Sequence, residues 1–203
     1  MTSPDTDEFS LQRILIHYVQ QTFIVDGNKP ALEAAIGDCL HGYHVALQTL
    51  IDAFPSKSTA YIQQLTEKDI LDRLQFDFDV VADILLRAGW RPQSAPKWLR
   101  RCARKLMSDD EIENPWAVFL GTLGAVHAQG IAIEHPDDPI IRFVILLRAS
   151  PPKPPGIRDL DEAHITRKLL DLNISIDKAA VVAAAEANLW GCVGVLAGKL
   201  KGE

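Results

Sequence analysis

The stretch "DVVADILLRAGWRP" (residues 79–92) shows how a helix is expected to form and to end in this chain. Its apolar residues have the spacing of a helix rather than the strict alternation of a half-buried strand. Gly89 suits the left-handed backbone conformation that commonly follows the last helical turn, and Pro92 prevents the helix from continuing. The stretch therefore predicts a helix that ends just before Gly89.

Similar boundaries occur along most of the sequence and predict further helices. A first helix is expected over about 10–25, before "DGN" at 26–28. Pro30 is expected to open a long helix that reaches Phe54 and is closed by Pro55. The apolar residues of this second segment form one stripe at helical spacing, which favours a single continuous helix.

Capping residues mark several helix starts. "TEKD" at 66–69 resembles a capping box in which Asp69 replaces the usual Glu. In "NPW" at 114–116 and "DPI" at 138–140, a capping residue precedes a proline at the first helical position. Each of these patterns predicts that a helix begins there.

Strand-like fragments are few. "GIAIEH" at 130–135 and "FVILL" at 143–147 are the candidates, and each could equally be a loop or a buried helix. The sequence therefore predicts an all-α protein of about eight helices, arranged as stacked helical hairpins.

Two stretches resemble parts of ankyrin repeats. Residues 79–92 are similar to the end of such a repeat, where an outer helix closes in Leu-Leu-x-x-Gly before a proline-containing loop. Residues 168–200 are similar to the passage from one repeat into the next, with an Ala-rich inner helix followed by "NL". The Thr-Pro-Leu-His box is absent, Gly191 and Gly194 stand at apolar positions, and the chain has no steady 33-residue period. The resemblance implies stacked hairpins, as a degenerate ankyrin-like arrangement or another helical repeat.

A proline-rich segment is expected to divide the chain. "PPKPPG" at 151–156 holds four prolines in six residues, which gives a stiff and extended connector. We expect a main helical body over 1–150 and a C-terminal helical hairpin over 157–203. Because a piece of about 47 residues is short for an independent core, we expect the hairpin to dock on the body.

Composition limits the class of protein. Hydrophobic residues make up 47% and charged residues 24% of the chain, as in a folded globular protein. Cys39, Cys102 and Cys192 are odd in number and far apart, which argues against disulfides and a zinc cluster. The sequence shows no secretory signal and no run long enough to span a membrane. We expect a cytoplasmic protein that needs no cofactor.

The segment "SAPKWLRRCARKLM" (94–107) carries the densest positive charge. Its basic residues line one face of a predicted helix, and Trp98, Leu99, Cys102, Ala103 and Leu106 line the other. The basic residues are Lys97, Arg100, Arg101, Arg104 and Lys105. Together with Arg87 and Arg91, and with Trp90 nearby, they give residues 87–105 a charge of +7, while the rest of the chain sums to −13. A surface this asymmetric attracts anions.

Four roles are open for this basic surface. It can be merely solvated, or it can contact an acidic protein, nucleic acid or, least favoured, an anionic membrane. The net charge of −6 weighs against nucleic acid, because the rest of the molecule would repel it. Our first hypothesis is a non-catalytic protein-binding module, an adaptor or an inhibitor or immunity-type protein, that binds an acidic-faced partner. The alternative is a nucleic-acid-associated regulator that uses the same helix at 97–105 with Trp90.

The stretch "DCLHGYH" (38–44) raises the question of a metal site. Asp38, His41 and His44 are potential ligands spaced three residues apart. In a continuous helix, Asp38 and His41 lie almost opposite the apolar stripe and His44 lies at its edge, which favours a solvated surface. A third hypothesis is a metal-dependent helical enzyme that adds His127 or His135 to these ligands.

The C-terminal segment is rich in small residues. Gly191, Gly194 and Gly198 allow a close approach of backbones, although glycine lowers helix propensity. Close packing on the main body is the first explanation, and a homodimer formed through 177–200 is the second. Trp190 is expected to anchor either contact.

Overall fold

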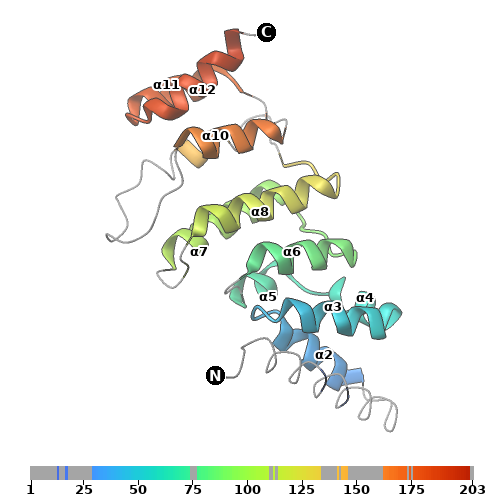
Figure 1. The fold of residues 1–203 in the computed structure, drawn as a ribbon. Coiled ribbons are helices and arrows are strands. Elements are labelled where there is room, and N and C mark those ends of the chain that lie inside the picture. Colours follow the sequence, from blue (N-terminus) through green and yellow to red (C-terminus); the bar gives the residue numbers. More distant parts are fainter. Residues whose placement is uncertain are drawn as a thin grey trace. The chain divides into compact units, whose positions relative to one another are not determined.

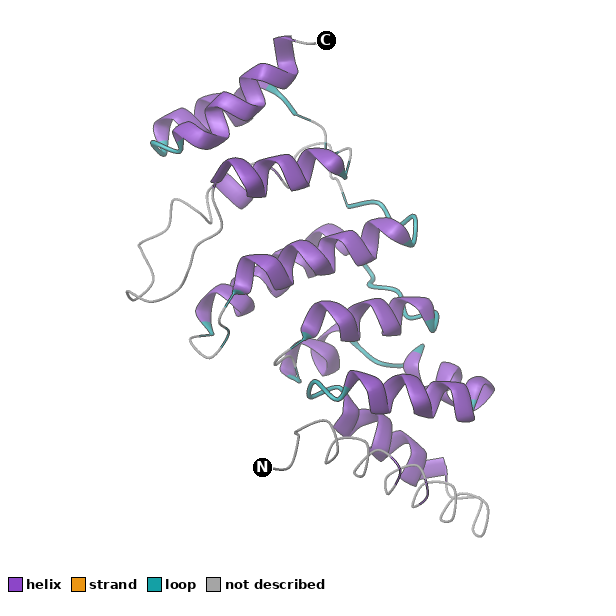
Figure 2. Cartoon of the chain, in the orientation of Figure 1, coloured by secondary structure: helices purple, strands orange, loops and turns teal. Residues whose placement is uncertain are grey.

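The structure, a computed structural model, consists of α-helices and their connections wherever it is described. It describes residues 29–73, 77–109, 112, 114–133, 141, 143–145, 162–172, 174 and 176–201, together with residues 13 and 17. Every regular element among these residues is an α-helix, which confirms the predicted all-α class (Figures 1 and 2). The predicted helix at 138–140 and the proline-rich segment at 151–156 lie outside the described residues, as does nearly all of the predicted helix over 10–25.

The chain divides into two compact units, residues 1–92 and residues 93–203, which we call the N-terminal and C-terminal units. The N-terminal unit contains α2 (Lys29–Cys39), α3 (His44–Ala53), α4 (Pro55–Ile62), α5 (Glu67–Asp72) and α6 (Phe78–Arg87). The C-terminal unit contains α7 (Ala95–Ser108), α8 (Pro115–Ala128), α10 (Glu162–Asp171), α11 (Lys178–Glu186) and α12 (Trp190–Lys201). This boundary lies well before the one that we expected at 151–156.

The long helix expected from Pro30 to Phe54 is two helices, so that prediction was wrong. The chain turns at Gly42, whose φ is +102°, and α3 starts two residues later. An isolated glycine is compatible with a helix in the sequence, but the turn lets α2 and α3 pack against each other. Leu32 on α2 and Leu47 on α3 are both buried. Pro55 likewise opens α4 as well as ending α3.

Three helices end in the same left-handed motif, at Gly89, Gly130 and Asn188. At the end of α6, the N–H of Gly89 donates to the carbonyl of Leu86 at 3.1 Å. The next N–H, of Trp90, donates to the carbonyl one residue earlier at 3.0 Å, and α8 and α11 repeat this pair of bonds. Such a pair satisfies carbonyls that the helix itself leaves open. The end of α6 predicted from the sequence is thereby confirmed.

Two predicted helix starts are also confirmed. Thr66 and Asp69 form a complete capping box at α5, because each side chain accepts a hydrogen bond from the backbone N–H of the other, at 3.1 and 2.9 Å. At α8, the Asn114 side chain accepts from the N–H of Ala117 at 3.1 Å, and Pro115 is the first helical residue. These bonds satisfy N–H groups that have no partner inside the helix.

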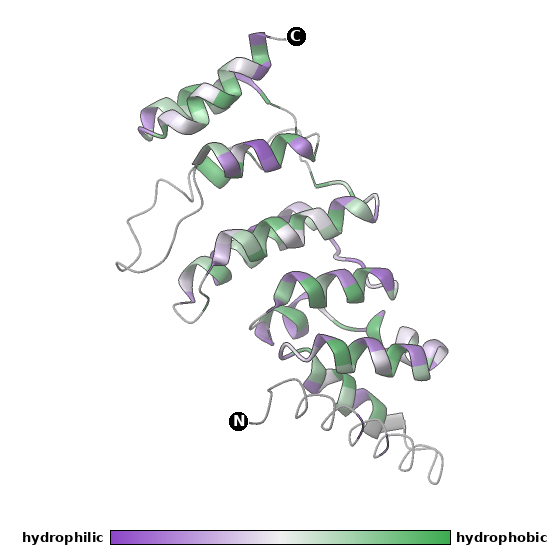
Figure 3. Cartoon of the chain, viewed as in Figure 1, coloured by the Kyte–Doolittle hydropathy of each residue, from purple (hydrophilic) through white to green (hydrophobic). Residues whose placement is uncertain are grey.

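The core of the N-terminal unit surrounds α3, which packs against α2, α4 and α6. In the C-terminal unit, α8 packs against α7 and α10, and α12 packs against α10 and α11. The described helices carry hydrophobic and hydrophilic residues side by side, as expected when one face of each is buried (Figure 3). Of the two strand-like fragments, residues 143–145 are helical and buried, and residues 131–133 form neither helix nor strand.

Candidate functional site

Helix α7 has one fully buried side and one strongly basic side. The five apolar residues predicted for its inner side, from Trp98 to Leu106, are all 0% exposed, and they pack where α7 meets α8. Burying a large apolar side chain contributes about 1.5–3 kcal/mol. This buried side therefore fixes the orientation of the helix and holds its other side outward.

The outer side of α7 carries five positive charges within 14 residues and no negative charge. Lys97, Arg101 and Arg104 are exposed, and Arg100 and Lys105 are half-buried. We call these five residues the α7 basic face. Like charges one helical turn apart cost about 0.2–0.5 kcal/mol per pair. The buried side of α7 therefore stabilises the fold, and repulsion within the α7 basic face destabilises it slightly.

Two arginines of the basic face share one aromatic ring. The Cζ atoms of Arg100 and Arg104 each lie 5.6 Å from the ring centroid of Phe143, which is 9% exposed. Cation–π contacts of this kind contribute about 0.5–1 kcal/mol each at exposed sites and restrict the guanidinium groups. Phe143 is a residue of this site that the sequence analysis did not include, since the run "FVILL" indicated only burial.

Arg87, Trp90 and Arg91 belong to the N-terminal unit, whereas the α7 basic face belongs to the C-terminal unit. Trp90 is 2% exposed, so it is a core residue and not the surface residue that we expected. Arg87 pairs with Asp83 through Nε and Oδ2 at 2.9 Å. Arg91 donates from Nη1 to the carbonyls of Leu86 and Trp90, at 2.5 and 2.7 Å, and so caps the end of α6.

The candidate metal ligands lie around the turn between α2 and α3. Asp38 and His41 are exposed, and His44 is the first residue of α3. The Nδ1 atom of His44 lies 3.6 Å from Oδ2 of Asp77, at the start of α6. Burial, with a smaller contribution from Asp77, raises the pKa of the neighbouring Asp79. Among the described residues, no three His, Cys, Asp or Glu side chains come together in a way that could hold a metal ion.

The metal hypothesis also named two histidines from later in the chain. His127 is exposed near the end of α8, in the C-terminal unit. His135 lies outside the described residues.

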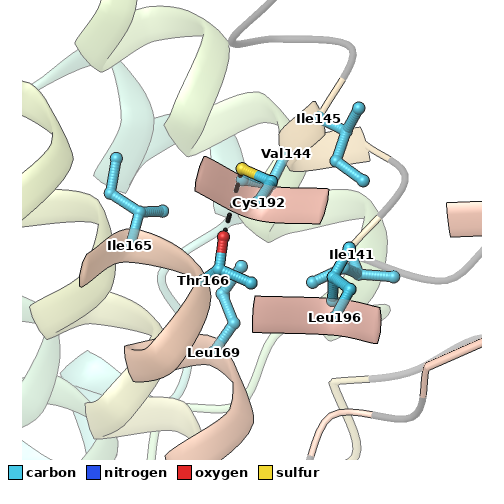
Figure 4. Close-up of a pocket in the computed structure, with 8 residues that line it drawn as sticks. All are labelled: Ile141, Val144, Ile145, Ile165, Thr166, Leu169, Cys192 and Leu196. Atoms are coloured by element: carbon cyan, nitrogen blue, oxygen red, sulfur yellow. Dashed lines mark hydrogen bonds between the residues drawn. The ribbon is translucent and has the colours of Figure 1, made fainter. Parts of the chain in front are cut away.

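The residues of α12 lie in two different environments. Cys192 and Leu196 are buried beside α10, where the Thr166 hydroxyl donates to Sγ of Cys192 at 3.2 Å (Figure 4). A Cβ atom built on Gly194 or Gly198 would meet no described atom within 4 Å. Within the described structure, these two glycines therefore do not provide the close packing that we expected.

The apolar residues around Thr166 and Cys192 come from three segments of the C-terminal unit. Ile141 and Val144 lie in the described part of the segment before α10, Ile165 and Leu169 lie on α10, and Leu196 lies on α12 (Figure 4). They enclose a small apolar pocket whose single polar pair is the hydroxyl and the thiol. This pocket has the composition of a protein core.

The α7 basic face thus belongs to an all-helical protein. No protein-family model, curated protein or solved structure that was compared with the chain matches it. None of the described helices has both the length and the apolar character needed to cross a membrane.

Proposed function

We propose that this chain is a non-catalytic protein-binding module whose α7 basic face contacts an acidic surface of a partner protein. The observation that carries the proposal is the arrangement of α7, with five cations on one side of a helix whose other side is completely buried. An adaptor or an inhibitor or immunity-type protein that acts in the cytoplasm would use such a surface.

The buried side of α7 favours binding because little has to be ordered when a partner arrives. The backbone is already fixed by the core, and Phe143 restricts two of the five cationic side chains. A pre-organised surface loses less conformational entropy on binding. Complementary charge also raises the association rate and makes it sensitive to salt.

The two units differ in net charge, and this difference favours a local contact through α7. Residues 1–92 contain 7 Lys or Arg and 13 Asp or Glu, a net charge of −6, whereas residues 93–203 contain 14 of each and sum to zero. Positive charge is thus concentrated on one helix of a neutral unit. An acidic protein surface of limited size fits this pattern better than a long polyanion, which the N-terminal unit would repel.

The nucleic-acid alternative is weakened by the burial of Trp90. This alternative used the basic helix with Trp90 nearby, but the indole of Trp90 is buried and bonded to a backbone carbonyl. Single-stranded nucleic acids are commonly bound by exposed aromatic side chains interleaved with cations. We therefore keep nucleic acid as an outcome of the tests and not as the proposal.

The anion affinity of the α7 basic face can be tested with two charge-matched variants of the full chain. One variant is Lys97→Gln/Arg101→Gln, and its control is Arg167→Gln/Lys168→Gln on α10, where both side chains are also exposed. On a heparin column, we expect the α7 variant to elute at clearly lower salt than the control, which has the same net charge. Equal elution of the two variants would show that α7 is an ordinary solvated surface.

A further inference from the structure

We propose that the outward side of α12 is a second docking surface, and that it binds an amphipathic helix of another protein that runs antiparallel to α12 and has an acidic first turn. The surface consists of Trp190, Gly194, Gly198 and Lys201, which we call the α12 outer face. It shares no residue with the α7 basic face. The inference therefore goes beyond the proposed function and does not rest on it.

The four residues of the α12 outer face lie on one side of a single helix. At about 100° per residue, they fall within an arc of about 80° and span about 16 Å along the helix axis. All four are exposed. Cys192 and Leu196 are buried on the opposite side of the helix, beside α10. The core of the C-terminal unit therefore fixes which side of α12 points outward.

Trp190 lies at the start of this face and differs from the other tryptophans of the chain. It is 65% exposed, whereas the other three are at most 4% exposed. An exposed tryptophan offers a large apolar area together with one hydrogen-bond donor. Tryptophan is also enriched among the residues that contribute most to protein–protein binding. Trp190 is thus the anchor at one end of the α12 outer face.

Gly194 and Gly198 are not explained by packing within the described chain. A Cβ atom built on either residue would meet no described atom within 4 Å. Both glycines lie inside α12, where glycine is less favourable than every residue except proline. Without side chains, this part of the helix lets the backbone of a partner approach closely. The two glycines thus form a contact area for a second helix, which a lipid surface would not require.

Lys201 indicates the charge of the partner helix. Residues 187–201 contain two charged side chains, Lys199 and Lys201, and both are basic. Lys201 lies at the C-terminal end of the α12 outer face, whereas Lys199 is about 160° away around the helix. The first turn of an antiparallel helix lies next to Lys201, and its dipole favours acidic residues in that turn. A carboxylate there stabilises both its own helix and the contact, and the α12 outer face of a second copy offers no carboxylate.

The test begins with a phage-displayed library of helical peptides of about five turns, randomised along one face and throughout the first turn. The library is selected on the full chain. Peptides that also bind Trp190→Ala are removed, because they do not use the α12 outer face. We expect the remaining peptides to carry Ala, Gly or Ser at four-residue spacing and Asp or Glu in the first turn.

Trp190 reports the binding of a selected peptide directly. Because the other tryptophans are buried, iodide quenching of the fluorescence measures mainly Trp190. A synthetic peptide without tryptophan should shift the emission to shorter wavelength and reduce the quenching at least twofold at saturation. Lys97→Gln/Arg101→Gln should bind this peptide as the wild type does, which separates the α12 outer face from the α7 basic face.

Three variants assign the contact to individual residues. Gly198→Leu fills the contact area and should weaken binding at least tenfold. Lys201→Glu should weaken binding at least threefold, and a peptide with Lys in place of its first-turn acid should restore it. Lys199→Glu makes the same charge change on the other side of α12 and should change binding by no more than twofold. Circular dichroism melting curves show whether each variant is folded.

Four results would overturn the proposal. A selection that yields no Trp190-dependent peptides, or only peptides without an acidic first turn, would rule out the acidic partner helix. Equal effects of Lys199→Glu and Lys201→Glu would contradict the antiparallel arrangement. A shift of the Trp190 emission with the concentration of the chain alone would make a second copy the occupant. The same shift on vesicles of phosphatidylcholine and phosphatidylserine would make the occupant a lipid surface.

Discussion

The indole N–H of Trp90 donates a hydrogen bond of 2.9 Å to the backbone carbonyl of Leu65, which lies 25 residues earlier in the chain. This bond joins the end of α6 to the segment between α4 and α5, and Trp90 is 2% exposed. It satisfies a polar group that the core would otherwise leave without a partner. Trp90 therefore stabilises the N-terminal unit from within.

Replacing Trp90 should destabilise the protein strongly. We expect Trp90→Ala to lower the free energy of unfolding by about 3–5 kcal/mol, through lost burial and the cavity that it leaves. Trp90→Phe keeps most of the apolar volume but loses the hydrogen bond, and should cost about 1–3 kcal/mol. Trp190→Ala is the control, because Trp190 is 65% exposed and should change stability by no more than about 0.5 kcal/mol. Urea unfolding of the four chains would contradict this account if the two alanine variants were equally stable.

The capping box at α5 predicts a pH-dependent contribution to stability. Thr66→Ala should cost about 0.5–2 kcal/mol at pH 7, because an N–H at the start of the helix loses its partner. Hydrogen bonds from the Thr66 side chain and backbone hold the pKa of Asp69 below its usual value. A carboxyl whose pKa is lowered by folding stabilises the protein above its unfolded pKa, and this contribution is lost as pH falls through its folded pKa.

The measurement is the difference in stability between Thr66→Ala and the wild type, at pH 7 and near pH 3. We expect the difference to be smaller at the lower pH. Thr49→Ala is a suitable comparison, since the Thr49 hydroxyl donates to a carbonyl of its own helix and has no capping role. A difference at Thr66 that does not depend on pH would show that Asp69 takes no part in the cap.

Replacing glycine by alanine should have opposite effects on stability at Gly89 and at Gly198. Gly89 has φ of +96°, and a Cβ atom there would lie 2.8 Å from Nε2 of Gln63. Gly89→Ala should therefore cost about 1–2 kcal/mol from the left-handed backbone alone. Gly198 lies within α12 and faces open space, so Gly198→Ala should stabilise the protein by up to about 1 kcal/mol.

The Gly198→Ala variant also tests the homodimer that we considered through residues 177–200. If α12 formed a close contact with a second copy, a methyl group at Gly198 would weaken the dimer instead of stabilising the chain. Sedimentation velocity over a range of concentrations distinguishes the two results. We expect the same sedimentation behaviour for the wild type and Gly198→Ala.

The three thiols should be unreactive in the folded protein. Cys39, Cys102 and Cys192 are all buried. Burial, with a smaller effect of the Asp38 carboxylate, raises the pKa of Cys39 to about 12. A thiol whose pKa is raised by folding favours the folded state fully below its unfolded pKa, and this contribution is lost as pH rises toward the folded value.

At pH 8, we expect Ellman's reagent to react with none of the three thiols within minutes, and with all three in denaturant, since the thiolate is the reactive form. Stability should decrease as pH rises above about 9. Rapid reaction of Cys39 in the native chain would contradict the burial of the turn between α2 and α3. Cys39→Ala identifies that thiol in the assay.

Much of the fold could be predicted because the decisive features are local. The capping box at Thr66, the cap at Asn114 and the helix end at Gly89 each depend on residues within five positions of one another. The two faces of α7 follow from helical spacing alone. Gly42 was harder, because a glycine inside an apolar pattern marks a turn only when two helices can pack across it.

The candidate site was predicted only in part because its other components are distant in sequence. Phe143 lies close to Arg100 and Arg104 in space, and no spacing rule relates residues so far apart in the chain. Trp90 was named among the partner-binding residues, although its indole N–H donates to the carbonyl of Leu65. Contacts of this kind depend on tertiary packing, which the sequence pattern does not contain.

Affinity capture from a nuclease-treated native lysate is the decisive experiment for the proposal that the α7 basic face binds an acidic protein. The full chain is compared with Arg100→Glu/Arg101→Glu/Arg104→Glu and with Arg167→Glu/Lys168→Glu/Lys178→Glu, which has the same charge change at exposed positions of α10 and α11. We predict that one acidic protein is captured at a fixed ratio by the wild type and by the α10–α11 variant, and is lost from the α7 variant. Capture that is lost equally from both variants, or that disappears with nuclease, would contradict the account.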